Sequence, residues 1–180
     1  MKNAIYLFIA FLLLRPFLHG TPLFAYYIIA LTAPLIHFAV KKDYHLFAFD
    51  YKDTIQSVVL NIAISSVLAV ILLVFGMGTR NFNWVAIGTM NLPLIFVSSF
   101  LQEMLFRYFL EGNLNRTLTA PFSILITSAV SAFVVSPPLL MGIVYFVMGI
   151  CIGWIFEQTK DIYGATIGHF ILYLFALVMI

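Results

Sequence analysis

This sequence is poor in charged residues. Lys, Arg, Asp and Glu together make up 9% of its 180 residues, whereas a soluble domain carries about 25%. Since a soluble domain of this size must cover a large surface with polar groups, this composition excludes a soluble globular protein, a disordered chain and a nucleic-acid-binding module. The apolar runs are long and do not alternate with polar residues, which predicts an all-α integral membrane protein.

Cysteine and the common catalytic motifs are also scarce. Cys151 is the only cysteine, so no disulfide can form within the chain, and its apolar surroundings indicate a packing role. HExxH, GxSxG, Walker A and dinucleotide-binding patterns do not occur, so no metal or cofactor is predicted. The partners we expect are membrane lipids and a peptide or membrane protein, and no nucleic acid.

The few charges and prolines divide the chain into about seven helical spans (six to eight). A bilayer core needs about 20 helical residues, so the uncharged run 117–156 holds two spans, separated at Pro137-Pro138. We expect spans near residues 4–18, 22–40, 55–77, 92–110, 121–136, 139–156 and 163–180. The first is short and is interrupted at Arg15-Pro16, so whether it crosses the membrane stays open. Within one membrane domain, residues 1–91 form N-terminal helices and 92–180 form the core.

The basic residues predict the orientation of this bundle. Two of them, Arg15 and Arg80, fall on one side. Six fall on the other: Lys2, Lys41, Lys42, Lys52, Arg116 and Lys160. Because cytoplasmic loops carry the excess of Lys and Arg, we expect a cytoplasmic N-terminus and a C-terminus outside.

Small and polar residues inside the spans predict close helix packing. The pairs Gly149/Gly153 and Gly164/Gly168 each place two glycines on one helix face. Two short polar faces accompany them, namely Asn61, Ser65 and Ser66, and Thr127, Ser128 and Ser131. Hydrogen-bonded packing is the default interpretation of these faces, and a path for water or substrate is the alternative.

Ionisable residues inside a span require an explanation, because each costs about 2.5 to 3.5 kcal/mol to insert. Glu103, Arg107 and Glu111 follow at spacings of four and share one helix face. They form either an ion-paired stripe or a site in which Arg107 positions Glu103 as a buried base. His169 lies within the last span, where a hydrogen-bonded core residue and a proton-transfer group are the two alternatives. The remaining histidines, His19, His37 and His45, are interpreted as interface or loop residues.

Three short patterns in the second half resemble the motifs of the CPBP family of CAAX proteases and bacteriocin-processing proteins. They are Gln102-Glu103-x-x-x-Arg107, Phe133-x-x-x-Pro137 and His169-x-x-x-Tyr173, where the family has E-E-x-x-x-R, F-x-x-x-H and H-x-x-x-N. The resemblance covers residues 92–180. It implies a polytopic protein, expected in a prokaryotic plasma membrane, that cleaves peptide bonds with water activated by glutamate and histidine.

The resemblance also implies roles for individual residues. Glu103 is the expected base, Arg107 positions it, His169 is its partner or an oxyanion donor, and the Tyr173 hydroxyl is a possible oxyanion donor.

Two water-activating positions depart from the family pattern. Gln102 cannot take a proton from water, and Pro137 has no polar side chain. Three hypotheses therefore stand: an intramembrane endopeptidase, a catalytically inactive binding or immunity protein on the same scaffold, and a small transporter or assembly subunit.

Overall fold

The computed structural model describes residues 2–18, 21–42, 50–74, 92–135 and 139–178, and within these ranges it is helical without strands. The helices in chain order are α1 (Lys2–Leu13), α2 (Thr21–Lys41), α3 (Tyr51–Val74), α5 (Leu92–Glu103), η3 (Met104–Glu111), α6 (Gly112–Leu114), α7 (Ala120–Val135), α8 (Leu139–Thr159) and α9 (Ile162–Val178). A short 3-10 turn, η1 (Arg15–Phe17), follows α1. The prediction of an all-α bundle is confirmed.

The predicted spans correspond to these helices within a few residues. The largest differences are that α1 ends at Leu13, that α3 begins at Tyr51 and that the fourth span continues as helix to Leu114. The interruption at Arg15-Pro16 is confirmed as the turn η1. His19, His45, Arg80, Pro137 and Pro138 lie outside the described residues.

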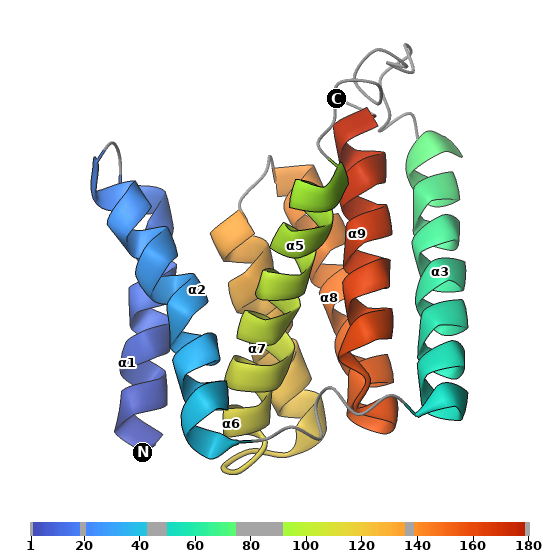
Figure 1. Cartoon of the computed structure of the whole chain (residues 1–180). Coiled ribbons are helices and arrows are strands. Elements are labelled where there is room, and N and C mark those ends of the chain that lie inside the picture. Colours follow the sequence, from blue (N-terminus) through green and yellow to red (C-terminus); the bar gives the residue numbers. More distant parts are fainter. Residues whose placement is uncertain (1, 19–20, 43–49, 75–91, 136–138, 179–180) are drawn as a thin grey trace.

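The long helices run up and down, with the N-terminus at one end of the bundle and the C-terminus at the other (Figure 1). The helix ends that carry Lys41, Arg116 and Lys160 therefore lie at the end where α1 begins. Arg15, which follows α1, lies at the opposite end. The structure thus segregates these charges as the sequence predicted, while the side of the membrane that each end faces stays a prediction.

Helix α3 has its polar side chains inside and its apolar side chains outside. Thr54, Ser57, Asn61 and Ser65 are buried, and the exposed face is made of Ile55, Val59, Leu60, Ile62, Val67, Val70 and Ile71. This is the reverse of a soluble helix and suits a helix whose outer face contacts lipid. Among the described residues, two stretches are long and apolar enough to cross a membrane, Tyr51–Ile71 and Gly142–Thr159.

The buried polar face of α3 packs on α9. Ser65 Oγ donates a hydrogen bond of 3.2 Å to the Gly168 carbonyl oxygen, and Thr54 Oγ1 donates one of 3.1 Å to Asp161 Oδ1. A Cβ on Gly164 would overlap the Ser57 side chain, so the glycine permits this close approach. Hydrogen-bonded packing between helices is confirmed for Ser65, whereas Asn61 Nδ2 donates within α3 to the Ser57 carbonyl oxygen at 2.9 Å, and Ser66 is exposed.

Helices α1 and α2 pack together on the other flank of the bundle (Figure 1). Tyr26 Oη donates a hydrogen bond of 3.0 Å to the Leu12 carbonyl oxygen, and the Phe8 ring meets the Phe109 ring edge-on at a centroid distance of 5.1 Å. With 12 residues, α1 is about 18 Å long, which is less than a bilayer core of about 30 Å.

Candidate active site

The central helix changes its winding at the ionisable residues. Regular α5 ends at Glu103, and the next eight residues, Met104–Glu111, form a π-helix. Segments of π-helix are rare and occur frequently at functional sites. The three residues Glu103, Arg107 and Glu111 are each at most 1% exposed, so the change of winding coincides with the buried charges.

Arg107 joins the two glutamates on this helix. Its Nε donates to Glu103 Oε2 at 3.2 Å, and its Nη1 donates to Glu111 Oε2 at 3.0 Å. The predicted alignment of these three residues is therefore confirmed. Gly153 of α8 makes room for the pair, because a Cβ there would lie 3.0 Å from both Arg107 Nη1 and Glu111 Oε2.

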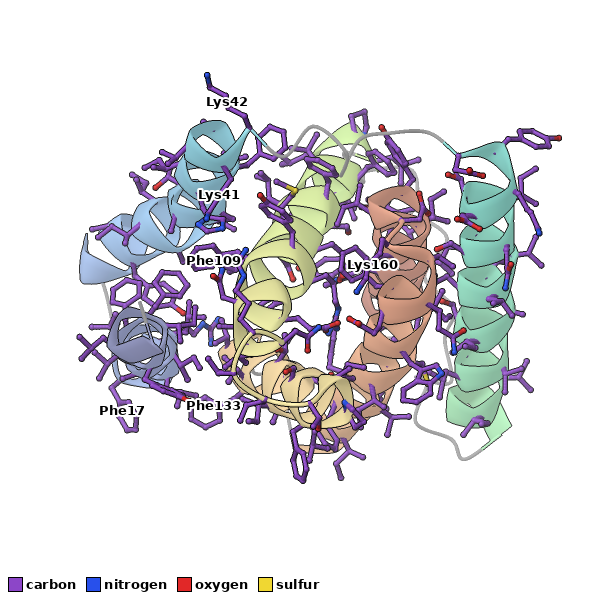
Figure 2. The ribbon with its side chains drawn as sticks, turned by 90° about the horizontal axis from the view of Figure 1, so that it is seen from below. Phe17, Lys41, Lys42, Phe109, Phe133 and Lys160 are labelled. Atoms are coloured by element: carbon purple, nitrogen blue, oxygen red, sulfur yellow. The ribbon has the colours of Figure 1, made fainter. Side chains whose placement is uncertain are left out.

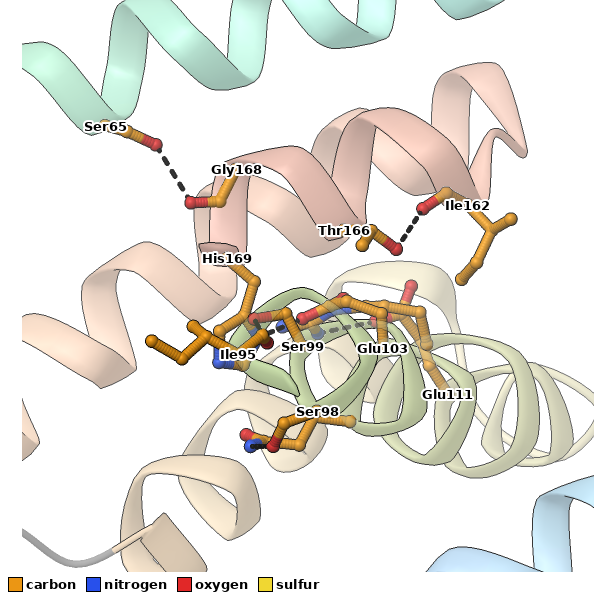
Figure 3. A network of polar contacts seen from close by, with 12 residues as sticks. Ser65, Ile95, Ser98, Ser99, Glu103, Glu111, Ile162, Thr166, Gly168 and His169 are labelled. Atoms are coloured by element: carbon orange, nitrogen blue, oxygen red, sulfur yellow. Dashed lines mark hydrogen bonds and ion pairs between the residues drawn. The ribbon is translucent and has the colours of Figure 1, made fainter. Parts of the chain in front are cut away.

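His169 of α9 completes the network from the opposite side. Its Nδ1 lies 2.6 Å from Glu103 Oε1, and the imidazole points toward the helix that carries Glu103 (Figure 3). The structure thus brings together Glu103, Arg107 and His169, which are three of the four residues predicted to carry chemistry. Glu111 is a further buried member of this network.

The second ring nitrogen of His169 stands apart from this network. Nε2 is buried and has no hydrogen-bond partner among the described residues. Beside the ring lies a cavity of about 10 Å³ lined by Glu103, Ser131, Tyr145 and Met148, among others, which is room for about one water molecule. A buried nitrogen without a partner is costly and calls for an explanation such as a catalytic role.

Gln102 and Tyr173 line a different cavity. Its volume is about 190 Å³, and Ser98 and Phe106 are among its other lining residues. Successive helical residues point about 100° apart, so Gln102 does not share the surroundings of Glu103. Its Nε2 instead lies 3.4 Å from Ser98 Oγ. Tyr173 is not among the residues that line the cavity beside His169, and its predicted role as oxyanion donor stays a prediction.

The second motif contributes no side chain to the buried network. Phe133 is 46% exposed on α7, and Pro137 lies outside the described residues. Tyr145, which lines the His169 cavity, was not predicted from the sequence because it belongs to no motif. Ser131 was predicted only as part of a polar face.

No group of His, Cys, Asp and Glu side chains that could hold a metal ion occurs within the described ranges. The described side chains at the site are carboxylates, an imidazole, a guanidinium and nearby hydroxyl groups.

Comparison with known families decides the membership that the motifs suggested. The model of the type II CAAX prenyl endopeptidase Rce1-like family matches residues 82–175, more than half of the chain. The chain belongs to this family. The matched region contains the whole network of Glu103, Arg107, Glu111 and His169, and the family is embedded in membranes. No curated protein and no solved structure matches the chain.

Proposed function

We propose that this chain is an intramembrane endopeptidase of the CAAX type, in which Glu103 and His169 together activate the attacking water. One observation carries the proposal: the 2.6 Å contact between Glu103 Oε1 and His169 Nδ1. Nε2 of the same residue, which lines the small cavity, has no partner among the described residues. Family membership supports the reaction class, and the roles of individual residues are inferred from geometry.

The contact assigns the proton on the imidazole. An ionised carboxylate only accepts hydrogen bonds, so His169 Nδ1 carries the proton and the Nε2 lone pair is free to accept another. Glu103 itself is held by Arg107 Nε on its second oxygen. The arrangement is that of a base oriented by a third group, with His169 as the base and Glu103 as the group that fixes its tautomer.

Hydrolysis then follows with the protons balanced. His169 Nε2 takes a proton from water while the water oxygen attacks the peptide carbonyl carbon and the carbonyl oxygen becomes an oxyanion. Glu103 stabilises the imidazolium formed in this step. When the C–N bond breaks, the imidazolium gives its proton to the leaving amine. His169 thus replaces the carboxylate that Gln102 lacks.

Oxyanion stabilisation needs a donor beside the same cavity. Ser131 and Tyr145 both line it, and the Tyr145 ring centroid lies 6.5 Å from that of His169. We assign the donor to one of these two hydroxyls in preference to Tyr173. With about 10 Å³ of space, the cavity must widen when a peptide enters.

A second candidate function is peptide binding without hydrolysis, as in an immunity protein. The small cavity and the neutral Gln102 favour it, because a cavity with room for about one water molecule excludes a peptide and a glutamine cannot take a proton from water. The two candidates differ in one observable, the incorporation of solvent oxygen into a cleaved product.

The test is cleavage in liposomes made with ¹⁸O-labelled water, using a prenylated peptide that ends in a CAAX sequence. We expect one ¹⁸O in the new carboxyl group, and a decrease of kcat by about 100-fold to 10,000-fold in His169→Ala and Glu103→Gln. Asp53→Asn, the same kind of change in an exposed carboxylate on α3, should retain the wild-type rate. Binding of the peptide without any product would support the second candidate instead.

A further inference from the structure

A cavity larger than the one beside His169 lies at the end of the bundle where α1 begins. Its volume is about 350 Å³, and its lining includes His37, Lys41, Arg107, Arg116, Glu157 and Lys160. We call it the basic cavity. It shares Arg107 with the active site but receives its other charges from the ends of α2, α6 and α8.

Cationic side chains outnumber carboxylates in this lining. Arg107 is held by Glu103 and Glu111 on its inner side, and Lys160 Nζ pairs with Glu157 Oε2 at 2.7 Å. Asn115 Nδ2 donates to the same Glu157 oxygen at 2.8 Å. Lys41 and Arg116 form no ion pair with any described residue, so the basic cavity has an excess of positive charge.

Figure 2 looks along the bundle from this end. Lys41 and Lys160 lie on either side of the helix that carries Phe109 and Arg107, whereas Lys42 points away from the bundle. Lys41 and Lys160 thus line the cavity from separate helices.

Lys160 occupies a backbone conformation that favours glycine. Its φ is 52°, in the left-handed region, and its N–H donates to the Phe156 carbonyl oxygen at 2.7 Å, which ends α8 in the manner of a helix cap that usually holds Gly. Lysine therefore adds charge at the cavity where glycine would fit the backbone better.

Positive side chains at helix ends also interact with the helix dipole, and this is the simpler explanation for Lys41, Lys42 and Lys160. It predicts equal contributions from lysines at the same helix end, whether or not they line the cavity. Lys41 lines the cavity and Lys42 does not, so the two explanations can be separated.

We propose that the basic cavity binds the phosphate of an anionic membrane lipid. Basic pockets between membrane helices at the cytoplasmic surface bind lipid headgroups of this kind, and this end of the bundle has the excess of Lys and Arg. The lining also includes Phe156 and Tyr108, whose rings suit the boundary between headgroups and acyl chains. The proposal does not depend on hydrolysis.

The experiment measures lipid binding to the full-length protein by native mass spectrometry, with phosphatidylglycerol and phosphatidylcholine at equal concentration. We expect phosphatidylglycerol to bind more tightly, and Lys41→Gln and Arg116→Gln each to weaken it about five-fold. Lys42→Gln, the adjacent change outside the cavity, should leave its affinity unchanged. Lys160→Gly should weaken binding while preserving the thermal stability of the lipid-free protein.

Three results would contradict the assignment. Equal affinity for the two lipids would show that the basic cavity does not select a headgroup with a net negative charge. Equal losses in Lys41→Gln and Lys42→Gln would show diffuse attraction at the helix end. Displacement of phosphatidylglycerol by millimolar inorganic phosphate, with no preference for the lipid, would assign the cavity to a free anion.

Discussion

At the scale of single residues, one arginine balances two carboxylates inside the bundle. Glu103, Arg107 and Glu111 carry a net negative charge when all three are ionised, and none of them is more than 1% exposed. Buried ion pairs of this kind add little net stability, yet breaking one leaves an uncompensated charge. The network is thus better explained by what it holds in place, which is the imidazole of His169.

We predict that Arg107→Met destabilises the protein by about 3 to 5 kcal/mol, because it leaves two neighbouring carboxylates buried without a cation. Lys160→Met removes a surface ion pair in which the lysine side chain is 60% exposed, and it should cost less than about 1 kcal/mol. Thermal unfolding in a neutral detergent measures both. Equal losses in the two variants would contradict the buried network.

The sequence predicted part of this site on physical grounds. Spacings of four residues were enough to align Glu103, Arg107 and Glu111 on one face. Contact of Glu103 with His169, 66 residues later, depends on how α9 packs, and only the family resemblance indicated it. Tyr145 could not be identified, because an aromatic residue in a membrane helix is ordinarily a packing residue.

At the scale of helices, glycines determine which elements reach the site. A Cβ on Gly153 would lie 3.0 Å from Arg107 Nη1, Glu111 Oε2 and Ile124 Cγ2. Helix α8 can therefore lie against the charged network only because this position has no side chain.

We predict that Gly153→Ala destabilises the protein by about 1 to 3 kcal/mol through overpacking and lowers peptide cleavage. A Cβ on Gly142, on the same helix, would meet no atom within 4 Å, so Gly142→Ala should be neutral or stabilise by up to about 1 kcal/mol. Unfolding midpoints of the two variants test this difference. An unfolding midpoint of Gly153→Ala equal to that of the wild type would show that α8 does not pack closely against Arg107 and Glu111.

The helix boundaries were the feature of the fold that the sequence predicted best, because charges and prolines mark them. The π-helix at Met104–Glu111 was not predicted. Its sequence has an ordinary helical pattern, and the wider winding depends on the packing of buried charges that spacing alone does not reveal.

At the scale of the whole molecule, the alternating helices place the basic residues at one end (Figure 1). The basic cavity lies at this end, and the His169 cavity lies inside the bundle. If the basic end is cytoplasmic, the basic cavity lies at the cytoplasmic surface and the active site lies deeper in the membrane. Arg107 lines both cavities.

We predict this orientation from the excess of Lys and Arg. In a Cys151→Ser background, Phe17→Cys should react with a membrane-impermeant maleimide added to intact cells. Phe17 is 73% exposed at the opposite end. Lys42→Cys should react only after the cells are permeabilised. The reverse labelling pattern would place the basic end outside.

The most direct test of the central claim is the ratio of cleavage rates between wild type and His169→Ala in the same liposomes, for variants with matching unfolding midpoints. If His169 Nε2 takes the proton from water, the ratio is about 100 or more. A ratio of one, or the absence of cleavage by wild type under conditions where the peptide binds, would contradict this role of His169.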